Sequence, residues 1–500
     1  MSTRETWGSR AGFVLAAVGS AIGLGNIWRF PYIAFKNGGG AFLIPYIFAL
    51  LTAGIPFMIL EFGLGHKFRG SAPKTFASIS KKWEWLGWLQ IGITFVIGIY
   101  YVAVIGWAIS YTFFSLTQAW GNAPKDFFFN QYLHLSSSPL ELGSIQTGIL
   151  ITTLMAWIIT WGVLHMGVRN GVEKISKIFM PLLFFMVLLI IGRTLTLDGA
   201  MNGLQWLFKP DFSKIMDYHV WTDAYGQIFY TLSIGFSIMI TYASYLPKKS
   251  DINNNACMTV FINCGFSLLA GIMIFGILGH MAAKQGVGVD EVVSSGVGLA
   301  FITIPTAINT LPAPVFFGTL FFLSLTVAGL SSLISIVQPM VSAITDKFGC
   351  SHRRGVALIC IPSIIFSIVF TTQGGLLLLD IVDHFINNFG ILFCGLIEII
   401  LLSWICRLDV MREHVNAISE FRVGKAWTFC LRFVTPIVLG YMSICNAIGD
   451  LSANYGGYSD KAILYYGWGV LGILVLLALF LHNKKAIDSN YAVVDQSLWR

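Results

Sequence analysis

The stretch Val18-Gly-Ser-Ala-Ile-Gly-Leu-Gly-Asn-Ile-Trp-Arg-Phe-Pro31 interrupts an otherwise apolar segment, and it decides the fold. Three glycines, a serine and an asparagine within eight residues make it a poor helix former. At membrane depth, non-helical backbone is tolerated only where it is buried in protein or lines a cavity. The sequence therefore predicts a membrane helix that breaks at its middle.

A second stretch, Gln227-Ile-Phe-Tyr-Thr-Leu-Ser-Ile-Gly-Phe-Ser237, is polar and glycine-interrupted in the same way. The two interruptions fall in the first and sixth apolar segments, which indicates an inverted repeat that pairs crossings one to five with six to ten. Close helix packing is the alternative reason for such glycines. Packing alone does not account for Asn26, Arg29 and Thr231 in the same stretches.

Composition places the remaining chain in a membrane. Of 500 residues, 56% are hydrophobic and only 11% are charged, against about 25% charged in soluble domains. Runs such as 86–124, 226–247 and 252–283 hold no Asp, Glu, Lys or Arg and are long enough to cross a bilayer. We predict an all-α protein with twelve transmembrane helices. Their expected starts lie near Ala11, Phe42, Trp85, Leu142, Ile178, Val220, Asn255, Val315, Gly355, Asp383, Thr428 and Ala462.

The domain organisation follows from these segments. We expect one transmembrane domain over 1–482, with a first repeat at about 10–195, a second at about 217–405 and two further helices at about 426–482. Residues 483–500 form a tail. The charge-free stretch between Glu291 and Asp346 is too long for one helix, and its prolines predict an outer lid segment packed on the protein.

The positive residues set the orientation. Most Lys and Arg fall in the loops that share a side with both termini, so these loops are predicted to be cytoplasmic. The net charge of +7 reflects this bias and not a nucleic-acid footprint. Short termini and a compact second outer loop favour the inner membrane of a prokaryote.

Broken helices supply the chemistry of a carrier. The N-terminus of a half-helix exposes N–H groups that suit a carboxylate, while freed carbonyls suit a cation. Ser, Thr and Asn side chains add oxygen ligands for sodium without adding charge. A zwitterionic amino acid and a sodium ion could therefore share one cavity.

These residues resemble a known family. Gly23-Leu-Gly-Asn-Ile-Trp-Arg-Phe-Pro31, followed by Asn37-Gly-Gly-Gly-Ala-Phe42, is similar to the signature of the neurotransmitter:sodium symporters, and most similar to their bacterial amino-acid members. The likeness covers about 4–480. It implies a leucine-transporter-like fold and a sodium-coupled symporter that imports a neutral, hydrophobic or aromatic L-amino acid by alternating access.

The resemblance implies two sodium sites. The first would use Ala21, Asn26, Thr231, Asn263 and the substrate carboxylate, and the second would use Gly19, Ile22, Ala328, Ser331 and Ser332. Without the family match, Ser331 and Ser332 could equally be packing serines.

The resemblance also implies a substrate site. The carboxylate would meet the N–H groups of Leu24 and Gly25 and the hydroxyl of Tyr101, which by itself could be a packing residue. Gly23 stands where amine carriers have an aspartate, which favours a true amino acid. The implied substrate-binding residues are Ser20, Ala21, Leu24, Gly25, Ile97, Tyr101, Tyr230, Ser233, Phe236, Ser332 and Ile336.

Ser267 replaces a glutamate of the leucine transporter, and chloride-dependent relatives carry serine there. The resemblance therefore implies a chloride site formed by Tyr46, Gln227, Thr231, Asn263 and Ser267. Asp223, one turn before Gln227, is the alternative source of negative charge.

The remaining charges are predicted to gate the cavity. Arg29 and Asp383 would form an outer pair, and the inner side would be closed by Arg4, Trp7, Ser244, Tyr245 and Asp346. Arg4 and Asp346 could also be ordinary juxtamembrane charges. Glu61 and Glu398 are expected to be buried structural acids, since an unpartnered charge in the membrane is costly.

The alternatives to a symporter are a channel, a membrane enzyme and a proton-coupled carrier of the same fold. A channel would show pore-lining rings or a filter loop, and we find neither. A membrane enzyme would need a nucleophile, a metal cluster or an acid–base pair, and none is evident. A proton-coupled carrier of the same fold would place a fixed cation on the fifth helix, where Met180 to Ile191 is apolar.

Overall fold

The structure is a computed structural model that describes residues 4–294, 296–487 and 491–498. Ten of its helices are long and apolar enough to span a membrane, and the bent pair Arg10–Ala21 and Leu24–Lys36 makes an eleventh span. Helices α12 (Tyr218–Thr231) and α13 (Ile238–Ala243) are each too short to be counted alone. That these two helices are the halves of a twelfth crossing stays a prediction.

The unbroken spans follow the predicted apolar segments in order. They are Gly40–Phe68, Lys81–Thr117, Thr147–His165, Val168–Thr194, Ile252–Gln285, Pro314–Phe348, His352–Thr371, Gly375–Ile405, Lys425–Gly457 and Asp460–Asn483. The spans that hold α7 (Glu84–Thr117) and α18 (Pro314–Phe348) are the most enclosed, being about nine-tenths buried over their most apolar stretch. These two helices therefore form the centre of the bundle.

Both predicted breaks are present in the backbone. Helix α1 (Arg10–Ala21) ends before Ile22, and the chain bends by 64° into α2 (Leu24–Ile27) and α3 (Arg29–Lys36). Between α12 and α13, Ser233, Gly235 and Ser237 all have positive φ, at 54°, 87° and 72°. L-residues adopt this region only where the surroundings impose it, so the second break is held by its packing.

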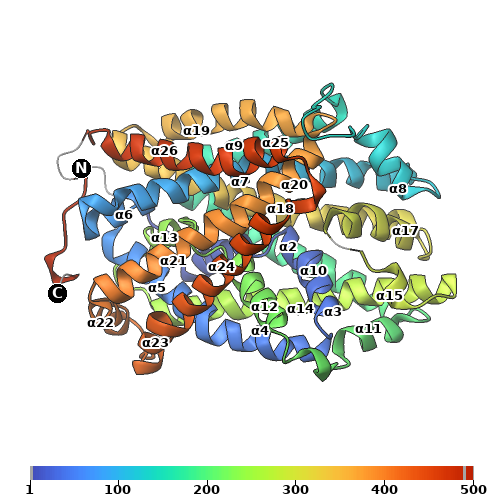
Figure 1. The fold of residues 1–500 in the computed structure, drawn as a ribbon, viewed down its shortest axis with the longest axis horizontal. Helices are drawn as coiled ribbons and strands as arrows, with labels where there is room; N and C mark the ends of the chain where they lie inside the picture. Colours follow the sequence, from blue (N-terminus) through green and yellow to red (C-terminus); the bar gives the residue numbers. More distant parts are fainter. Residues whose placement is uncertain (1–3, 295, 488–490, 499–500) are drawn as a thin grey trace.

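The two ends of the bundle differ (Figure 1). Both termini lie at one end, here called the terminal end, and the loop helices α8 (Pro124–Asp126), α11 (Ala200–Phe208) and α17 (Ile304–Ile308) lie at the other, the opposite end. The expected lid packs there, where Phe301 stacks on Phe128 with ring centroids 5.4 Å apart.

Two predicted helix starts were wrong. The tenth span begins at Gly375 and not near Asp383, because hydrogen bonds from Tyr100 and Asn387 let the Asp383 carboxylate lie inside the helix. The fifth span begins at Val168 and not near Ile178, because its first turns hold charges that pair with one another, such as Lys177 with Glu173 at 2.7 Å.

The tail is packed against the terminal end, apart from residues 488–490 and 499–500, which lie outside the described residues. Asp495 forms an ion pair with Lys67 at 3.0 Å, and its N–H donates to the carbonyl of Ser78. Burial would raise the pKa of Asp495, but hydrogen bonds from Ser497 and Lys67 lower it below its ordinary value. The tail is therefore attached to the bundle as an ionised, hydrogen-bonded segment.

Candidate functional site

All eleven predicted substrate-binding residues line one cavity of about 60 Å³ between the two breaks. Sequence reasoning missed three further lining residues, Tyr100, Asn387 and Ile391. Tyr100 adjoins the predicted Tyr101, and Asn387 lies one turn after Asp383, so both were near residues already singled out. The cavity is polar at the breaks and apolar at Ile97, Phe236 and Ile336.

The first break offers N–H groups to this cavity. The Leu24 N–H donates to the Tyr101 hydroxyl at 3.3 Å, which brings together two of the predicted carboxylate ligands. A Cβ on Gly25 would lie 2.4 Å from Cε1 of Tyr230, so only glycine allows this approach. The Gly25 position therefore requires glycine for the aromatic ring to cover the break.

The predicted first sodium site is a cluster of buried oxygens. Asn26 Nδ2 lies 2.9 Å from Thr231 Oγ1, 3.0 Å from Asn263 Oδ1 and 2.8 Å from Ser267 Oγ. One amide group has only two hydrogens for these three oxygens. The cluster gathers buried hydroxyl and amide oxygens with no fixed charge, and such oxygens suit a hard monovalent cation.

The predicted second sodium site lies where α1 ends. The Gly23 N–H donates to Asn26 Oδ1 at 2.9 Å and therefore does not continue the backbone hydrogen bonding of α1. Carbonyls in the last turn of α1 are left free as a result. Ser332 Oγ donates to the Ile22 carbonyl at 3.2 Å, and a Cβ on Gly19 would lie 2.5 Å from Ser331 Oγ. The structure thus brings four of the five predicted ligands together.

The fifth helix presents no cation to this second site. The sulfur and methyl of Met180 lie 3.2 Å from the position that a Gly19 Cβ would take. A proton-coupled carrier would have its fixed positive charge on this helix. At this position the fifth helix has the uncharged thioether of Met180.

Three of the five predicted chloride residues, Thr231, Asn263 and Ser267, belong to the first sodium cluster. Both amide atoms of Gln227 are buried without a hydrogen-bond partner among the described residues. Ser267 Oγ contacts Asn26, while the Tyr46 hydroxyl donates to the Cys264 sulfur, a weak acceptor. An anion would give the Gln227 N–H groups an acceptor, so the residues fit the group.

Asp223, the alternative source of charge, is already paired. Its Oδ2 lies 3.2 Å from Lys36 Nζ and 2.9 Å from Asn37 Nδ2. Its carboxylate is therefore already paired with a cation and an amide.

The five predicted inner-gate residues are in contact at the terminal end. Arg4 forms an ion pair with Asp346 at 2.7 Å and donates to Ser244 at 2.8 Å. Its guanidinium lies 4.6 Å from the centre of the Tyr245 ring. The backbone N–H of Trp7 donates to the Tyr245 carbonyl. The cavity is closed on this side.

The predicted outer pair is not in contact. Arg29 lies over the Tyr230 ring at 5.2 Å, while Asp383 accepts a hydrogen bond from the Tyr100 hydroxyl at 2.6 Å. A cavity of about 440 Å³ separates them and leads to the opposite end. The site is therefore closed toward the termini and open toward the other end, and pairing of Arg29 with Asp383 stays a prediction.

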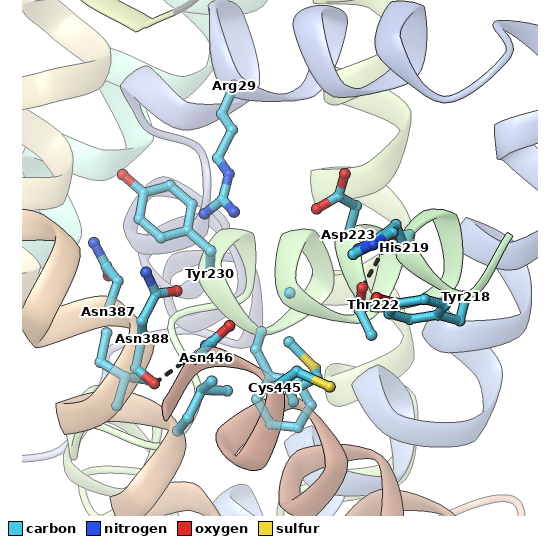
Figure 2. A pocket seen from close by; sticks show the side chains of 15 residues that line it. Arg29, Tyr218, His219, Thr222, Asp223, Tyr230, Asn387, Asn388, Cys445 and Asn446 are labelled. Carbon is cyan, nitrogen blue, oxygen red and sulfur yellow. Dashed lines mark hydrogen bonds between the residues drawn. The ribbon is translucent and has the colours of Figure 1, made fainter. Parts of the chain in front are cut away.

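A second cavity of about 230 Å³ adjoins the first (Figure 2). Arg29 extends beside the Tyr230 ring at its edge, and Asp223 lies across it, next to His219. Asn446 donates to the Asn388 carbonyl at 3.4 Å on the remaining wall. Arg29 thus lines both of these cavities.

Comparison with known proteins gives a family for this geometry. The chain matches the model of the sodium:neurotransmitter symporter family over 4–123 and 119–487. It is 44% identical, over 97% of this chain and 98% of the relative, to an uncharacterized sodium-dependent transporter of Methanocaldococcus jannaschii. The chain belongs to the sodium:neurotransmitter symporter family. This confirms the resemblance seen in the first-break motif and the fold class that it implied.

Two further relatives share less of their sequence with this chain. The symporter is 30% identical to the bovine sodium- and chloride-dependent GABA transporter 2, over 95% of this chain and 85% of the relative. It is 28% identical to the sodium-dependent dopamine transporter of Caenorhabditis elegans, again over 95% of this chain and 85% of the relative. Family membership makes this chain a sodium-dependent, multi-pass membrane transporter for a small molecule.

Proposed function

We propose that this symporter imports a neutral, hydrophobic or aromatic L-amino acid together with sodium, by alternating access. The observation that carries the proposal is the cavity between the two breaks. It combines the N–H groups of Leu24 and Gly25 and the Tyr101 hydroxyl with an oxygen cluster at Asn26 and an apolar wall. A carboxylate, a cation and an apolar side chain each have a matching surface there.

The orientation and the state of the molecule are part of the proposal. The positive-residue bias supports a cytoplasmic terminal end in the inner membrane, with both termini inside. The ion pair between Arg4 and Asp346 then closes the cytoplasmic side, while the separation of Arg29 from Asp383 leaves the outside open. The described conformation would be the one that receives substrate.

Two sodium ions are proposed for each substrate, one in the Asn26 cluster and one beside Ser331 and Ser332. The inverted repeat, with halves at about 10–195 and 217–405, would carry one broken helix in each half. Binding of radiolabelled common amino acids to purified protein, in sodium or in potassium, tests both the substrate and the ion. Binding that is indifferent to sodium but dependent on pH would favour the proton-coupled alternative.

The Tyr101 hydroxyl should strengthen binding of the substrate carboxylate. Tyr101→Phe is expected to weaken sodium-dependent binding roughly tenfold, since one hydrogen bond to a charged group is lost while the ring stays in place. Saturation binding measures the effect. Tyr111→Phe is the matched control, because its hydroxyl bonds the Phe301 carbonyl, away from the cavity. Equal affinities for the two variants would contradict the assignment.

Chloride is proposed as the negative charge that balances sodium near Ser267. Replacing chloride with gluconate should reduce sodium-dependent binding by about an order of magnitude. Without the anion, the positive charges of the buried sodium ions would repel one another strongly. Ser267→Glu should make binding indifferent to chloride, since it supplies a fixed carboxylate. Uptake that is unchanged in gluconate for the unaltered protein would reject the proposal.

A further inference from the structure

The backbone that follows α13 is held by the end of α5 (Ile55–Phe68). The two helices approach closely, because a Cβ on Gly65 would overlap the Ile240 carbonyl. Arg69, the C-cap of α5, donates through Nη1 to the Leu246 carbonyl at 2.7 Å. Leu246 directly follows two of the predicted inner-gate residues, so this contact fixes the chain beside the gate.

A pair of histidines holds the next carbonyl. His66 Nε2 lies 3.0 Å from the Pro247 carbonyl oxygen, and His66 Nδ1 lies 3.1 Å from His414 Nε2. His414 belongs to α22 (Leu408–Ile418), which lies between the tenth and eleventh spans. The ring centroids are 5.3 Å apart, nearly the largest separation that this contact allows, so the two nitrogens point at each other.

When both rings are neutral, only one arrangement of hydrogens satisfies both contacts of His66. A carbonyl oxygen only accepts, so the His66 nitrogen that faces Pro247 must carry the N–H. The other nitrogen of His66 is then an acceptor, and the facing nitrogen of His414 must donate to it. Burial, together with the neighbouring His66 and Lys67, lowers the pKa of His414 to about 4, so this ring is neutral at pH 7.

The segment that contains His414 also holds the far end of the same loop. Ser419, the residue after α22, accepts the N–H groups of Ile252 and Asn253 through Oγ, each at 3.1 Å. The loop 246–253 is therefore held at both ends from one side. The contact at its far end is direct, and the contact at its start passes through His66.

We propose that His414 is a positioning residue for the inner gate, because its N–H sets the tautomer with which His66 holds the Pro247 carbonyl. The inference rests on the proposed function, in which the terminal end is the closed inner side. In the other tautomer, a lone pair of His66 would face the carbonyl oxygen and repel it. His414 thus keeps the chain beyond α13 in the position that closes the gate.

Hydrogen exchange of the purified full-length protein in lipid tests the proposal, with residues 244–253 as the reporter. His414→Phe should accelerate exchange there roughly fivefold, because the hydrogen bond that orients His66 is lost. His414→Gln should exchange within about twofold of the unaltered protein, since its side-chain amide supplies the same donor. His352→Phe is the matched control, because His352 is also partly buried and bonds a carbonyl, that of Leu164, outside the gate. Equal acceleration by His414→Phe and His414→Gln would mean that the ring acts by packing, which would overturn the proposal.

A double variant tests whether His414 acts through His66. His66→Phe should accelerate exchange at least as much as His414→Phe, and the double variant should exchange like His66→Phe alone. Additive effects of the two substitutions would contradict the proposed route, because independent residues contribute separately.

Transport measures the connection to the gate. Sodium-driven uptake into proteoliposomes should fall roughly fivefold in His414→Phe and recover to within about twofold in His414→Gln. Faster exchange with unchanged uptake in His414→Phe would show that this segment does not support the gate, and would reject the proposal. Exchange is read without substrate, so it does not depend on which amino acid is carried. Binding that is indifferent to sodium in the unaltered protein would instead refute the proposed function.

Discussion

Replacing Asn26 with alanine should lower sodium-dependent substrate binding by roughly a hundredfold or more. The Asn26 amide contacts Thr231, Asn263 and Ser267 and also fixes the end of α1 through the Gly23 N–H. Truncation would remove a donor from these buried oxygens and leave the Gly23 N–H without its side-chain acceptor, at a cost of about 1–3 kcal/mol for each group left unpaired. It would also remove one proposed sodium ligand.

Saturation binding across a sodium titration measures this effect. The half-saturating sodium concentration should rise along with the loss of substrate affinity. Asn253→Ala is the matched control, because Asn253 is an equally buried asparagine whose amide contacts Asn416 and Phe421, outside the cavity. If both variants bind alike, Asn26 is a packing residue and the first sodium site is wrong.

Asp346→Ala should abolish transport by opening the inner side. Asp346 accepts from the Arg4 guanidinium through one oxygen and from the Ser71 N–H through the other, at 2.7 and 2.8 Å. Removal of the Asp346 carboxylate leaves Arg4 without its ion-pair partner. Such a loss costs about 3–5 kcal/mol for a fully buried pair, and less for Arg4, which is only partly buried. That loss would favour conformations in which the N-terminal segment separates from the bundle.

Hydrogen exchange and flux together test this second prediction. Exchange should accelerate in residues 4–21 while substrate accumulation in proteoliposomes falls to background. Asp409→Ala serves as the control, because Asp409 also pairs with an arginine, Arg412 at 2.9 Å, but lies outside the gate. Unchanged exchange in Asp346→Ala would mean that the ion pair does not hold the inner side closed.

Much of the site could be predicted from local sequence. Glycine, serine and asparagine in an apolar segment cannot form a stable membrane helix, so the breaks at Ile22 and Ser233 follow from composition. The family signature around Asn26 then supplied the ligands, and the structure gathers its substrate residues in one cavity. Roles for individual ligands stay predictions until binding is measured.

Contacts between distant segments could not be predicted in the same way. Tyr100 and Asn387 line the cavity because the third and tenth spans meet there, and no local pattern marks that meeting. The start of the tenth span was misjudged for the same reason, since Asp383 is stabilised inside the helix by another span. The unpaired state of Arg29 is likewise a property of one conformation.

The sequence by itself determined that this chain spans a membrane, where its helices break and to which family it belongs. Those properties depend on the hydrophobicity and backbone preferences of contiguous residues. Only the tertiary structure decided that Glu61 accepts the Gly235 N–H, that Asp223 pairs with Lys36 and that the cavity is closed at the terminal end. These contacts join residues far apart in the chain, so they depend on how the helices pack.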